Sequence, residues 1–393
     1  MDKSKLSMYG SFIYTMIIIL VITISVRSSN NMIMTDISLF SKYVLNFSQF
    51  EVGILESVLA FGTFFTTSFI NSRSGSNTRR YLFISANIGY TIMLALIHFS
   101  NFITIWIIII FSGFSFGLIM PNIITAAGLF NDRKTRERAL SIYTISLSIS
   151  LILGPTIASF VLRYFPIGDA FLFFVPFGII SSALSPFLRF PEEKKSNAHV
   201  KVFSNNGFMA AVFGILSYNI IFAVLTAFGG IFARSQLHVS LSLANTIFAV
   251  FFLFSFASRL YMSFRPPRDL WHYLGTAMMI TFIGSILIFL SSDLFIYLIA
   301  YIILGIPHGV TYPTSIISIS RSFDESSRNV ANSYFFSVMM SIGIIMPILG
   351  GYIIKYIGFR TLFLYIAPLI IVLMVLTFIT FKKTQNIKSI ALN

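Results

Sequence analysis

The chain is dominated by long, uninterrupted apolar runs. Segments 11–26 (SFIYTMIIILVITISV), 102–120 (FITIWIIIIFSGFSFGLIM) and 361–381 (TLFLYIAPLIIVLMVLTFITF) approach or reach the roughly 20 residues that cross a bilayer core as a helix. A membrane β-barrel would instead show alternating segments of about 10 residues. Composition agrees, because 56% of the residues are hydrophobic and 10% are charged, whereas about a quarter of a soluble domain is charged. The sequence therefore predicts an all-α integral membrane protein.

These runs predict twelve transmembrane helices. The first run ends in ISVRSSNN without a small-residue cleavage site, so we interpret it as a retained helix and not as a signal peptide. An even number of helices places both termini on the same side of the membrane. The expected helices lie at about 9–38, 48–70, 80–99, 103–129, 139–164, 170–188, 208–233, 241–263, 271–291, 295–319, 329–355 and 361–381.

The distribution of Lys and Arg indicates the orientation. Most of the 27 basic residues fall in alternate connecting segments and at the termini, and the other segments hold only Lys42, Arg163, Arg234, Lys355 and Arg360. Because cytoplasmic loops carry an excess of basic residues, we expect a multi-pass protein of the cell membrane with both termini cytoplasmic. The net charge of +14 then reflects topology, and nucleic acid is not an expected partner.

One motif occurs twice in the chain. GFSFGLIMP (113–121) returns 192 residues later as GIPHGVTYP (305–313). Further residues match at the same shift, among them Arg73 with Arg265. A fixed period that holds across several helices indicates an internal duplication. We therefore expect two six-helix bundles related by a pseudo-twofold axis along the membrane normal, with a ligand site between them.

The longest polar stretch separates the two halves. It reads RFPEEKKSNAHVKVFSNNG and covers residues 189–207. The sequence predicts an N-terminal six-helix bundle in residues 1–188, a cytoplasmic linker in 189–207 and a C-terminal six-helix bundle in 208–393.

Within each copy of the motif, two glycines and a proline recur every four residues and share one face of a helix. Glycine at this spacing lets neighbouring helices approach closely, which predicts a packing role for Gly113, Gly117, Gly305 and Gly309. Pro121 and Pro313 each free a backbone carbonyl one turn earlier and can bend the helix, so a role in gating is the alternative.

The chain resembles the major facilitator superfamily of secondary transporters over essentially its whole length. The loop SFINSRSGSNTRRYL (68–82) is similar to the family's loop between helices two and three, although Ser72 stands where aspartate is usual. The gating residues that this resemblance implies are Arg73, Gly75, Arg79 and Arg80.

Other stretches carry the same resemblance. RERALSIYTISLSISLILGPTIAS (136–159) contains the Gly-Pro pair of the family's exchangers as Gly154 and Pro155, which implies gating there and favours a drug-efflux type. Residues 328–363 resemble the eleventh helix and the start of the twelfth. Many proton-coupled exchangers carry an arginine on helix four where this chain has Ile109.

Few ionisable residues lie inside the expected helices, and such residues are candidates for function. Arg27 is followed by Asn30 and Asn31 on the same helix face. Arg27 could bind an anionic substrate, because an arginine side chain suits carboxylate or phosphate. The alternative is a structural role, in which Arg27 reaches a membrane interface or pairs with a structural acid. Asn219 aligns with Arg27 at the shift of 192, and His308 lies near the middle of helix ten.

In the family, helices one, four, seven and ten line the cavity. The resemblance therefore implies substrate binding by Arg27, Asn30, Asn219 and His308. His308 aligns with Phe116 of the first half, and because of this difference we expect His308 to determine substrate specificity. The alternative is that His308 only packs against its neighbours.

Glu56 is the one carboxylate clearly inside an expected helix. A buried carboxyl favours its neutral form, so Glu56 is a candidate proton carrier. A fixed salt bridge, such as one with Arg27, is the alternative.

The expected function is secondary active transport of a small organic solute by alternating access, with proton-coupled efflux as one form and uptake of a polar or anionic metabolite as another. We expect a monomer in the lipid bilayer without a cofactor. The chain has no cysteine, no phosphate-binding loop for ATP and five scattered histidines without metal-ligand spacing. A membrane-embedded enzyme is the alternative of another class. Such an enzyme would need clustered carboxylates and histidines, and the sequence shows none.

Overall fold

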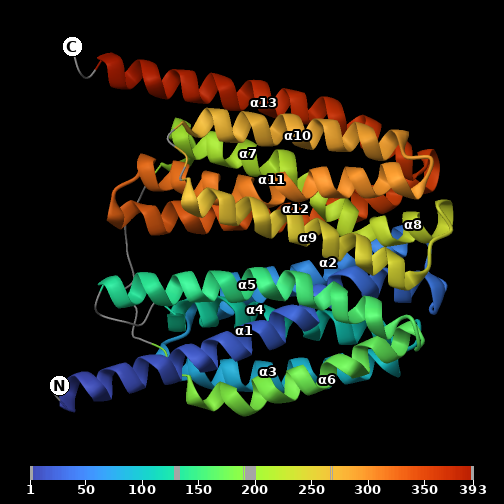
Figure 1. Ribbon diagram of the computed structural model, residues 1–393, viewed down its shortest axis with the longest axis horizontal. Coiled ribbons are helices and arrows are strands. Elements are labelled where there is room, and N and C mark those ends of the chain that lie inside the picture. Colours follow the sequence, from blue (N-terminus) through green and yellow to red (C-terminus); the bar gives the residue numbers. More distant parts are fainter. Residues whose placement is uncertain are drawn as a thin grey trace. The chain divides into compact units, whose positions relative to one another are not determined.

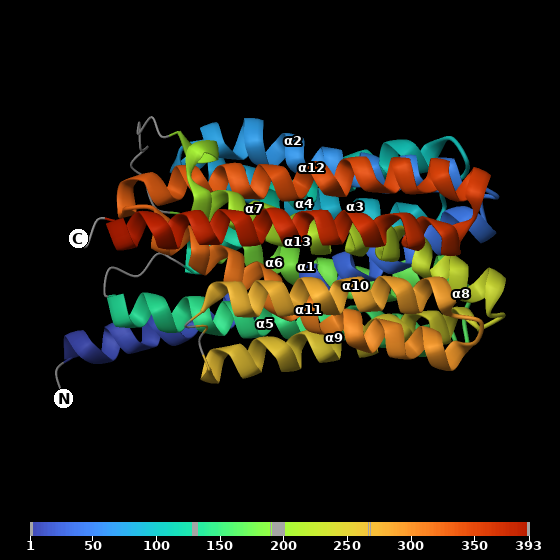
Figure 2. The ribbon, with the colours of Figure 1, turned by 90° about the horizontal axis from the view of Figure 1, so that it is seen from above.

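The structure is a computed structural model, and it describes residues 3–127, 133–188, 190, 201–265, 267 and 269–390. The described residues are helical or form short connections, and twelve helical segments are long and apolar enough to cross a membrane. Helices suit this environment because lipid offers no partner for backbone N–H and C=O groups. The predicted all-α class and its twelve transmembrane helices are therefore confirmed. Figures 1 and 2 show helices running side by side within each of two units.

The first compact unit comprises Met1–Phe47 and Val58–Lys194. Its helices are α1 (Lys3–Tyr43), α2 (Gln49–Phe65) from Val58 onward, α3 (Ser76–His98), α4 (Thr104–Ala127), α5 (Arg133–Val161) and α6 (Ile167–Leu184). Short turns η1 (Thr66–Ile70), η2 (Asn71–Arg73) and η3 (Ser185–Phe187) complete it. α1 packs along α5 and α6, and α3 packs along α4 and α6.

The second compact unit comprises Ser48–Ser57, which includes the start of α2, and Lys195–Asn393. Its other elements are η4 (Val202–Ser204), α7 (Asn206–Val224), η5 (Leu225–Gly229), α8 (Gly230–Gln236), α9 (Leu241–Phe264), α10 (Leu270–Leu290), α11 (Leu294–Ser322), α12 (Glu325–Ile357) and α13 (Phe359–Ile390). α7 packs against α11, α12 and α13, and α11 packs against α9 and α10. The domain boundaries expected from the sequence stay a prediction, and residues 191–200 of the expected linker lie outside the described residues.

The seventh expected helix is one span built from three elements. α7 passes through the π-helical turn η5 into α8, so the span covers Asn206–Gln236. Tyr297 donates a hydrogen bond from its hydroxyl to the carbonyl oxygen of Gly229 at 2.9 Å. A side chain at Gly229 would collide with the Tyr301 hydroxyl. A π-turn changes the hydrogen-bond pattern of the backbone inside a helix, and Tyr297 gives one of its carbonyl groups a partner.

The glycines of the repeated motif lie against a neighbouring backbone in the first unit. A Cβ atom on Gly113 would lie 2.5 Å from the carbonyl oxygen of Leu59, and one on Gly117 would collide with the carbonyl oxygen of Thr63. Both contacted residues belong to α2. The close approach of α4 to α2 therefore requires glycine at both positions.

The second copy of the motif makes the equivalent contacts in the second unit. A Cβ atom on Gly305 would collide with the carbonyl oxygen of Phe251, and one on Gly309 with that of Ser255. Phe251 and Ser255 of α9 lie 192 residues after the α2 residues met by the first copy. The predicted packing role of the glycines is confirmed, and the sequence repeat is also a repeat of helix contacts.

The backbone carbonyl that Pro121 frees has a side-chain partner. Proline cannot donate to the carbonyl four residues earlier, which is that of Gly117. Thr67 donates its hydroxyl to this oxygen at 2.9 Å, and Thr66 donates to the carbonyl oxygen of Phe114 at 3.0 Å. Thr67, in η1 directly after α2, thus compensates for the proline in α4, and Thr66 adds a second hydrogen bond from η1 to the α4 backbone.

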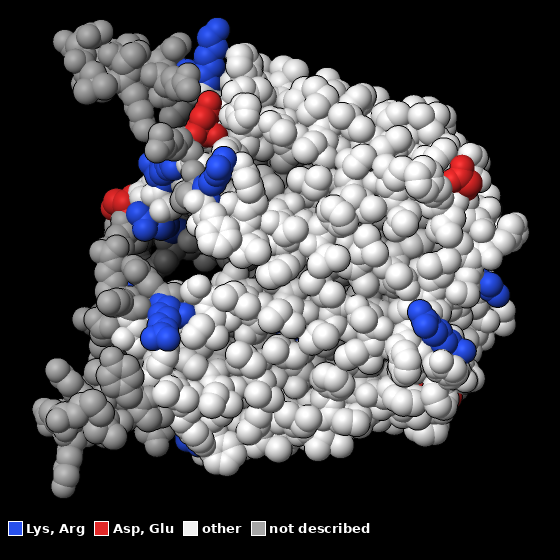
Figure 3. Space-filling model, viewed as in Figure 1, with Lys and Arg blue, Asp and Glu red and all other residues white. Residues whose placement is uncertain are grey.

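Charged side chains avoid the middle of the surface that Figure 3 shows. On the face in Figure 3, Lys, Arg, Asp and Glu lie toward the two ends, and the broad region between the ends carries none. A membrane core imposes this pattern because a charge at its centre is costly. Which end faces the cytoplasm stays a prediction.

Candidate functional site

Arg27 lies near the middle of α1 among aromatic side chains of its own unit. Its guanidinium carbon is 5.4 Å from the centre of the Phe116 ring on α4. Tyr90 of α3 and Tyr143 of α5 lie close enough to interact with the guanidinium electrostatically. Four helices of the first unit therefore meet around this one cation.

The guanidinium of Arg27 has little polar compensation. Among the described residues its Nε has no hydrogen-bond partner, and no carboxylate of the first unit lies within 4 Å of it. Burial of a cation without such partners is costly. The contact with the face of the Phe116 ring stabilises the buried cation by only about 0.5–2 kcal/mol. The arrangement is suited to receive a negatively charged group.

Asn30 and Asn31 extend the polar face of α1. Both are buried, and Asn31 Nδ2 has no hydrogen-bond partner among the described residues. Tyr90 donates from its hydroxyl to Ser29 Oγ at 3.2 Å, which fixes the tyrosine beside this face. The structure thus brings Arg27 and the asparagines into one polar stripe, as their spacing predicts.

Gly154 brings α5 close to the same stripe. A Cβ atom on Gly154 would lie 2.5 Å from the carbonyl oxygen of Ser28 and 3.1 Å from Cβ of Asn31. Pro155 follows inside α5. The contact shows why glycine is needed at this position, and the gating role of the Gly-Pro pair stays a prediction.

His308 lies on α11 inside a group of aromatic rings of the second unit. Its Nδ1 is hydrogen-bonded to Ser255 Oγ of α9 at 2.6 Å. The surrounding rings, with their centroid distances from His308, are Phe222 at 4.8 Å, Phe251 at 5.3 Å, Tyr218 at 5.4 Å and Phe252 at 5.5 Å. The imidazole is held in place by one polar and four aromatic contacts.

Further polar groups lie near this imidazole. Arg259 donates from Nη2 to the carbonyl oxygen of His308 at 3.5 Å. The hydroxyls of Tyr218 and Thr311 are buried and have no hydrogen-bond partner among the described residues. Asn219 follows Tyr218 on α7 and is half-buried, and its expected place beside His308 stays a prediction. The second unit therefore offers its own cluster of hydrogen-bonding groups.

Glu56 is buried, with 8% of its surface exposed, and its Oε1 has no hydrogen-bond partner among the described residues. The next residue, Ser57, donates to the carbonyl oxygen of Ile344 at 2.6 Å, which ties this part of α2 to α12. Glu56 and Arg27 belong to different units, so both readings of Glu56, as a proton carrier and as a partner in a salt bridge such as one with Arg27, stay predictions.

The expected gating loop is held by carbonyl contacts within the first unit. Arg79 is buried and donates from Nη2 to the carbonyl oxygen of Ser74 at 3.3 Å. Arg80 donates to the carbonyl oxygen of Pro186 at 2.9 Å. The Arg73 guanidinium lies 5.8 Å from the Phe69 ring, and Gly75 precedes α3 with an ordinary φ of −75°. The structure gives these residues packing contacts, and their gating role stays a prediction.

Sequence reasoning missed the aromatic neighbours of both clusters. Tyr90 and Tyr143 stand far from Arg27 in the chain, and no spacing rule connects them. Asp36, which is fully buried on α1, also received no role. Among the described residues no group of three or more His, Asp or Glu side chains is placed to hold a metal ion.

The fold is that of a multi-pass membrane protein, and a match to a family model identifies the family. The profile of the Major Facilitator Superfamily matches residues 16–272 and 236–390. The chain therefore belongs to the major facilitator superfamily. It is a membrane transporter of small solutes and not an enzyme.

Solved structures share the fold at low sequence identity. A bacterial homologue of the human lysosomal transporter Spinster, inward-facing and occupied, is 14% identical with a TM-score of 0.71 over 94% of this chain and 96% of that chain. A mutant of the nucleoside transporter NupG is 15% identical with a TM-score of 0.74 over 93% and 100%. The POT family transporter PepTSo is 10% identical with a TM-score of 0.76 over 95% and 98%. These likenesses confirm the predicted fold.

Proposed function

We propose that this transporter carries small organic anions and that Arg27 binds their negative group. The observation that supports this proposal is the guanidinium of Arg27, partly buried beside Phe116 without a carboxylate from its own unit among the described residues. A carboxylate or phosphate of the solute would complete its hydrogen bonds. Asn30 supplies further polar contacts on α1. Asn219 and His308 supply them in the second unit, where the aromatic rings suit an unsaturated or ring-bearing solute.

The repeat and the family support transport by alternating access. In this proposal the two halves expose the site to one side of the membrane at a time, and both termini are cytoplasmic. The gating residues are those expected from the sequence: Arg73, Gly75, Arg79, Arg80, Gly154 and Pro155.

The test is uptake into proteoliposomes with a panel of radiolabelled organic anions, cations and neutral solutes. Arg27→Gln should raise the KM for the transported anion about tenfold or more, because a charge-assisted hydrogen bond contributes about 1.5–3 kcal/mol. Arg27→Lys should recover part of this loss, and Arg163→Gln, at an exposed arginine of the same unit, should change nothing. Unchanged anion transport in folded Arg27→Gln would rule out the proposed role.

Proton-coupled efflux is a second proposal, and the buried carboxyl of Glu56 supports it. An imposed pH gradient should drive transport in the wild type, whereas Glu56→Gln should transport only down the gradient of the solute. Transport that ignores both the pH gradient and this substitution would refute proton coupling. It would leave anion binding by Arg27 intact.

A further inference from the structure

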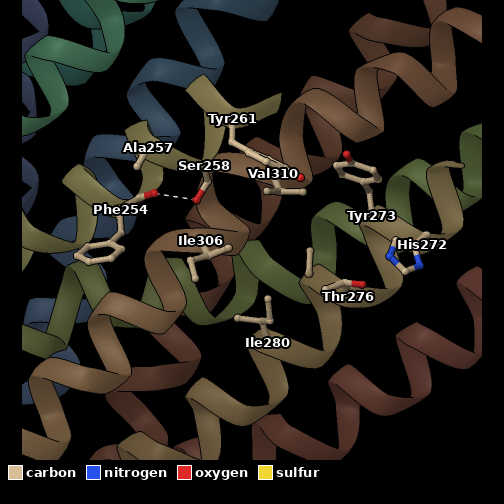
Figure 4. A pocket seen from close by; sticks show the side chains of 11 residues that line it. Phe254, Ala257, Ser258, Tyr261, His272, Tyr273, Thr276, Ile280, Ile306 and Val310 are labelled. Carbon is tan, nitrogen blue, oxygen red and sulfur yellow. Dashed lines mark hydrogen bonds between the residues drawn. The ribbon is translucent and has the colours of Figure 1, made fainter. Parts of the chain in front are cut away.

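A groove lies between α9 and α10 of the second unit, and neither His308 nor its partners Ser255 and Arg259 line it. Both helices pack along α11 and hardly touch each other. The groove has a volume of about 480 Å³, and α11 forms its floor. Its lining is Phe254, Ala257, Ser258, Tyr261, His272, Tyr273, Thr276, Ala277, Ile280, Ile306 and Val310. Figure 4 shows these side chains converging from the three helices.

The lining changes from polar to apolar along the groove. His272 and Tyr273 lie in the first turn of α10, near the α9–α10 connection, whereas Ile280 lies eight residues further along. Eight helical residues span about 12 Å, which is close to the roughly 15 Å depth of one leaflet of the hydrocarbon core. In Figure 4, Ile280 and Ile306 lie together at the end opposite Tyr261 and Tyr273. The groove therefore has the polarity gradient of half a bilayer.

The surface on both sides of the groove is apolar and exposed. Leu260 and Tyr261 of α9 are 45% and 54% exposed, and Met279 and Ile283 of α10 are 43% and 44% exposed. In a multi-pass membrane protein such a surface faces lipid. Lipids can therefore reach the groove from the bilayer.

One cation is held at the polar end of the groove by two of its lining residues. The Arg265 guanidinium lies 6.0 Å from the Tyr261 ring, and Tyr273 donates from its hydroxyl to the Arg265 carbonyl oxygen at 3.2 Å. Arg265 is exposed and has no carboxylate within 4 Å among the described residues. The nearby Asp269 accepts from the backbone N–H groups of Trp271 and His272, which engages its Oδ1 in capping α10.

We propose that this groove binds one anionic membrane phospholipid. One of its acyl chains lies along Phe254, Ile280 and Ile306, and its phosphate lies beside Arg265. Basic residues at the membrane surface attract anionic lipid headgroups, and an apolar groove between helices adds the contact with the chain. This inference concerns a site on the second unit only, and it does not depend on the identity of the transported solute.

The test is native mass spectrometry of the delipidated full-length transporter titrated with phosphatidylglycerol or phosphatidylcholine. One phosphatidylglycerol should bind more tightly than phosphatidylcholine. Arg265→Ala should weaken phosphatidylglycerol binding about fivefold, the equivalent of ~1 kcal/mol. It should weaken phosphatidylcholine binding less, because the choline cation offsets the charge of the phosphate. Lys382→Ala, at an exposed lysine of α13 that does not line the groove, is the matched control.

Filling the groove tests the acyl-chain site separately. Thr276→Trp and Ile280→Trp should each remove the tightly bound lipid, whereas Met279→Trp on the outward face of α10 should keep it. Transport activity shows whether each tryptophan variant is folded. The comparison of wild type with Arg265→Ala remains a test even if a tryptophan variant does not fold. Equal phosphatidylglycerol binding by wild type and Arg265→Ala, or a retained lipid in a folded filled variant, would overturn the proposal.

Discussion

Replacing Gly117 by alanine should weaken the packing of α4 on α2. The added Cβ would collide with the carbonyl oxygen of Thr63 and lie 3.0 Å from its carbonyl carbon. The Cβ would also collide with Thr66 Oγ1, which can rotate away, but the Thr63 atoms belong to the backbone and cannot, so the two helices must separate. Overpacking of this kind costs about 1–3 kcal/mol.

Gly89→Ala on α3 is the matched control for this substitution. Its Cβ would meet only Ser115 Oγ, at 3.4 Å, which is an ordinary contact. Both variants replace glycine by alanine inside a helix, and both gain the same ~0.5–1 kcal/mol of helix propensity. This gain cancels in the comparison, so Gly117→Ala should be less stable than Gly89→Ala by about 1–3 kcal/mol.

The assay is reversible unfolding by sodium dodecyl sulfate in mixed micelles, followed by circular dichroism, with transport measured on the same preparations. Gly309→Ala should behave like Gly117→Ala, because its Cβ would collide with the Ser255 carbonyl oxygen in the second unit. Equal unfolding free energies for Gly117→Ala and Gly89→Ala would refute the argument that backbone contact requires glycine here.

Three further predictions follow from single contacts. Thr67→Val should destabilise the protein by about 1 kcal/mol, measured by the same unfolding assay, because the Gly117 carbonyl oxygen loses its donor; no change would mean that this carbonyl needs no partner. Ser255→Ala releases Nδ1 of His308 and should raise the KM of transport without lowering the amount of folded protein, and an unchanged KM would place His308 outside substrate binding. Ser292→Cys, exposed between α10 and α11, should react with a membrane-impermeant maleimide added to intact cells, and labelling only after cell disruption would reverse the predicted orientation.

Helices and their number could be predicted from the sequence because lipid leaves the backbone few choices. A run of about 20 apolar residues has to form a helix, since no water is present to satisfy its polar groups. The expected helices at 241–263 and 271–291 therefore lie within a residue of α9 and α10. The π-turn η5 was not predictable in the same way, because it depends on the hydroxyls of Tyr297 and Tyr301 from α11.

The candidate site was predictable in part. Arg27, Asn30 and Asn31 share a face of one helix, so their spacing alone placed them together. The rings around His308 come from α7 and α9, and the neighbours of Arg27 come from α3, α4 and α5. Contacts between helices far apart in the chain depend on how the helices pack, and periodicity within one helix carries no information about them.

The sequence by itself determined that this chain forms twelve membrane-length helices, that its glycine motif recurs after 192 residues and that charge is excluded from most of the apolar core. These properties follow from the cost of exposing backbone or charge to lipid, which acts on each segment separately. Only the tertiary structure decided that Gly113 and Gly117 meet α2, that Arg27 lies beside Phe116 without an acid from its own unit among the described residues, and that α9 and α10 leave a groove over α11. Packing between helices depends on side-chain shape at many positions at once, and only the assembled helices bring those positions together.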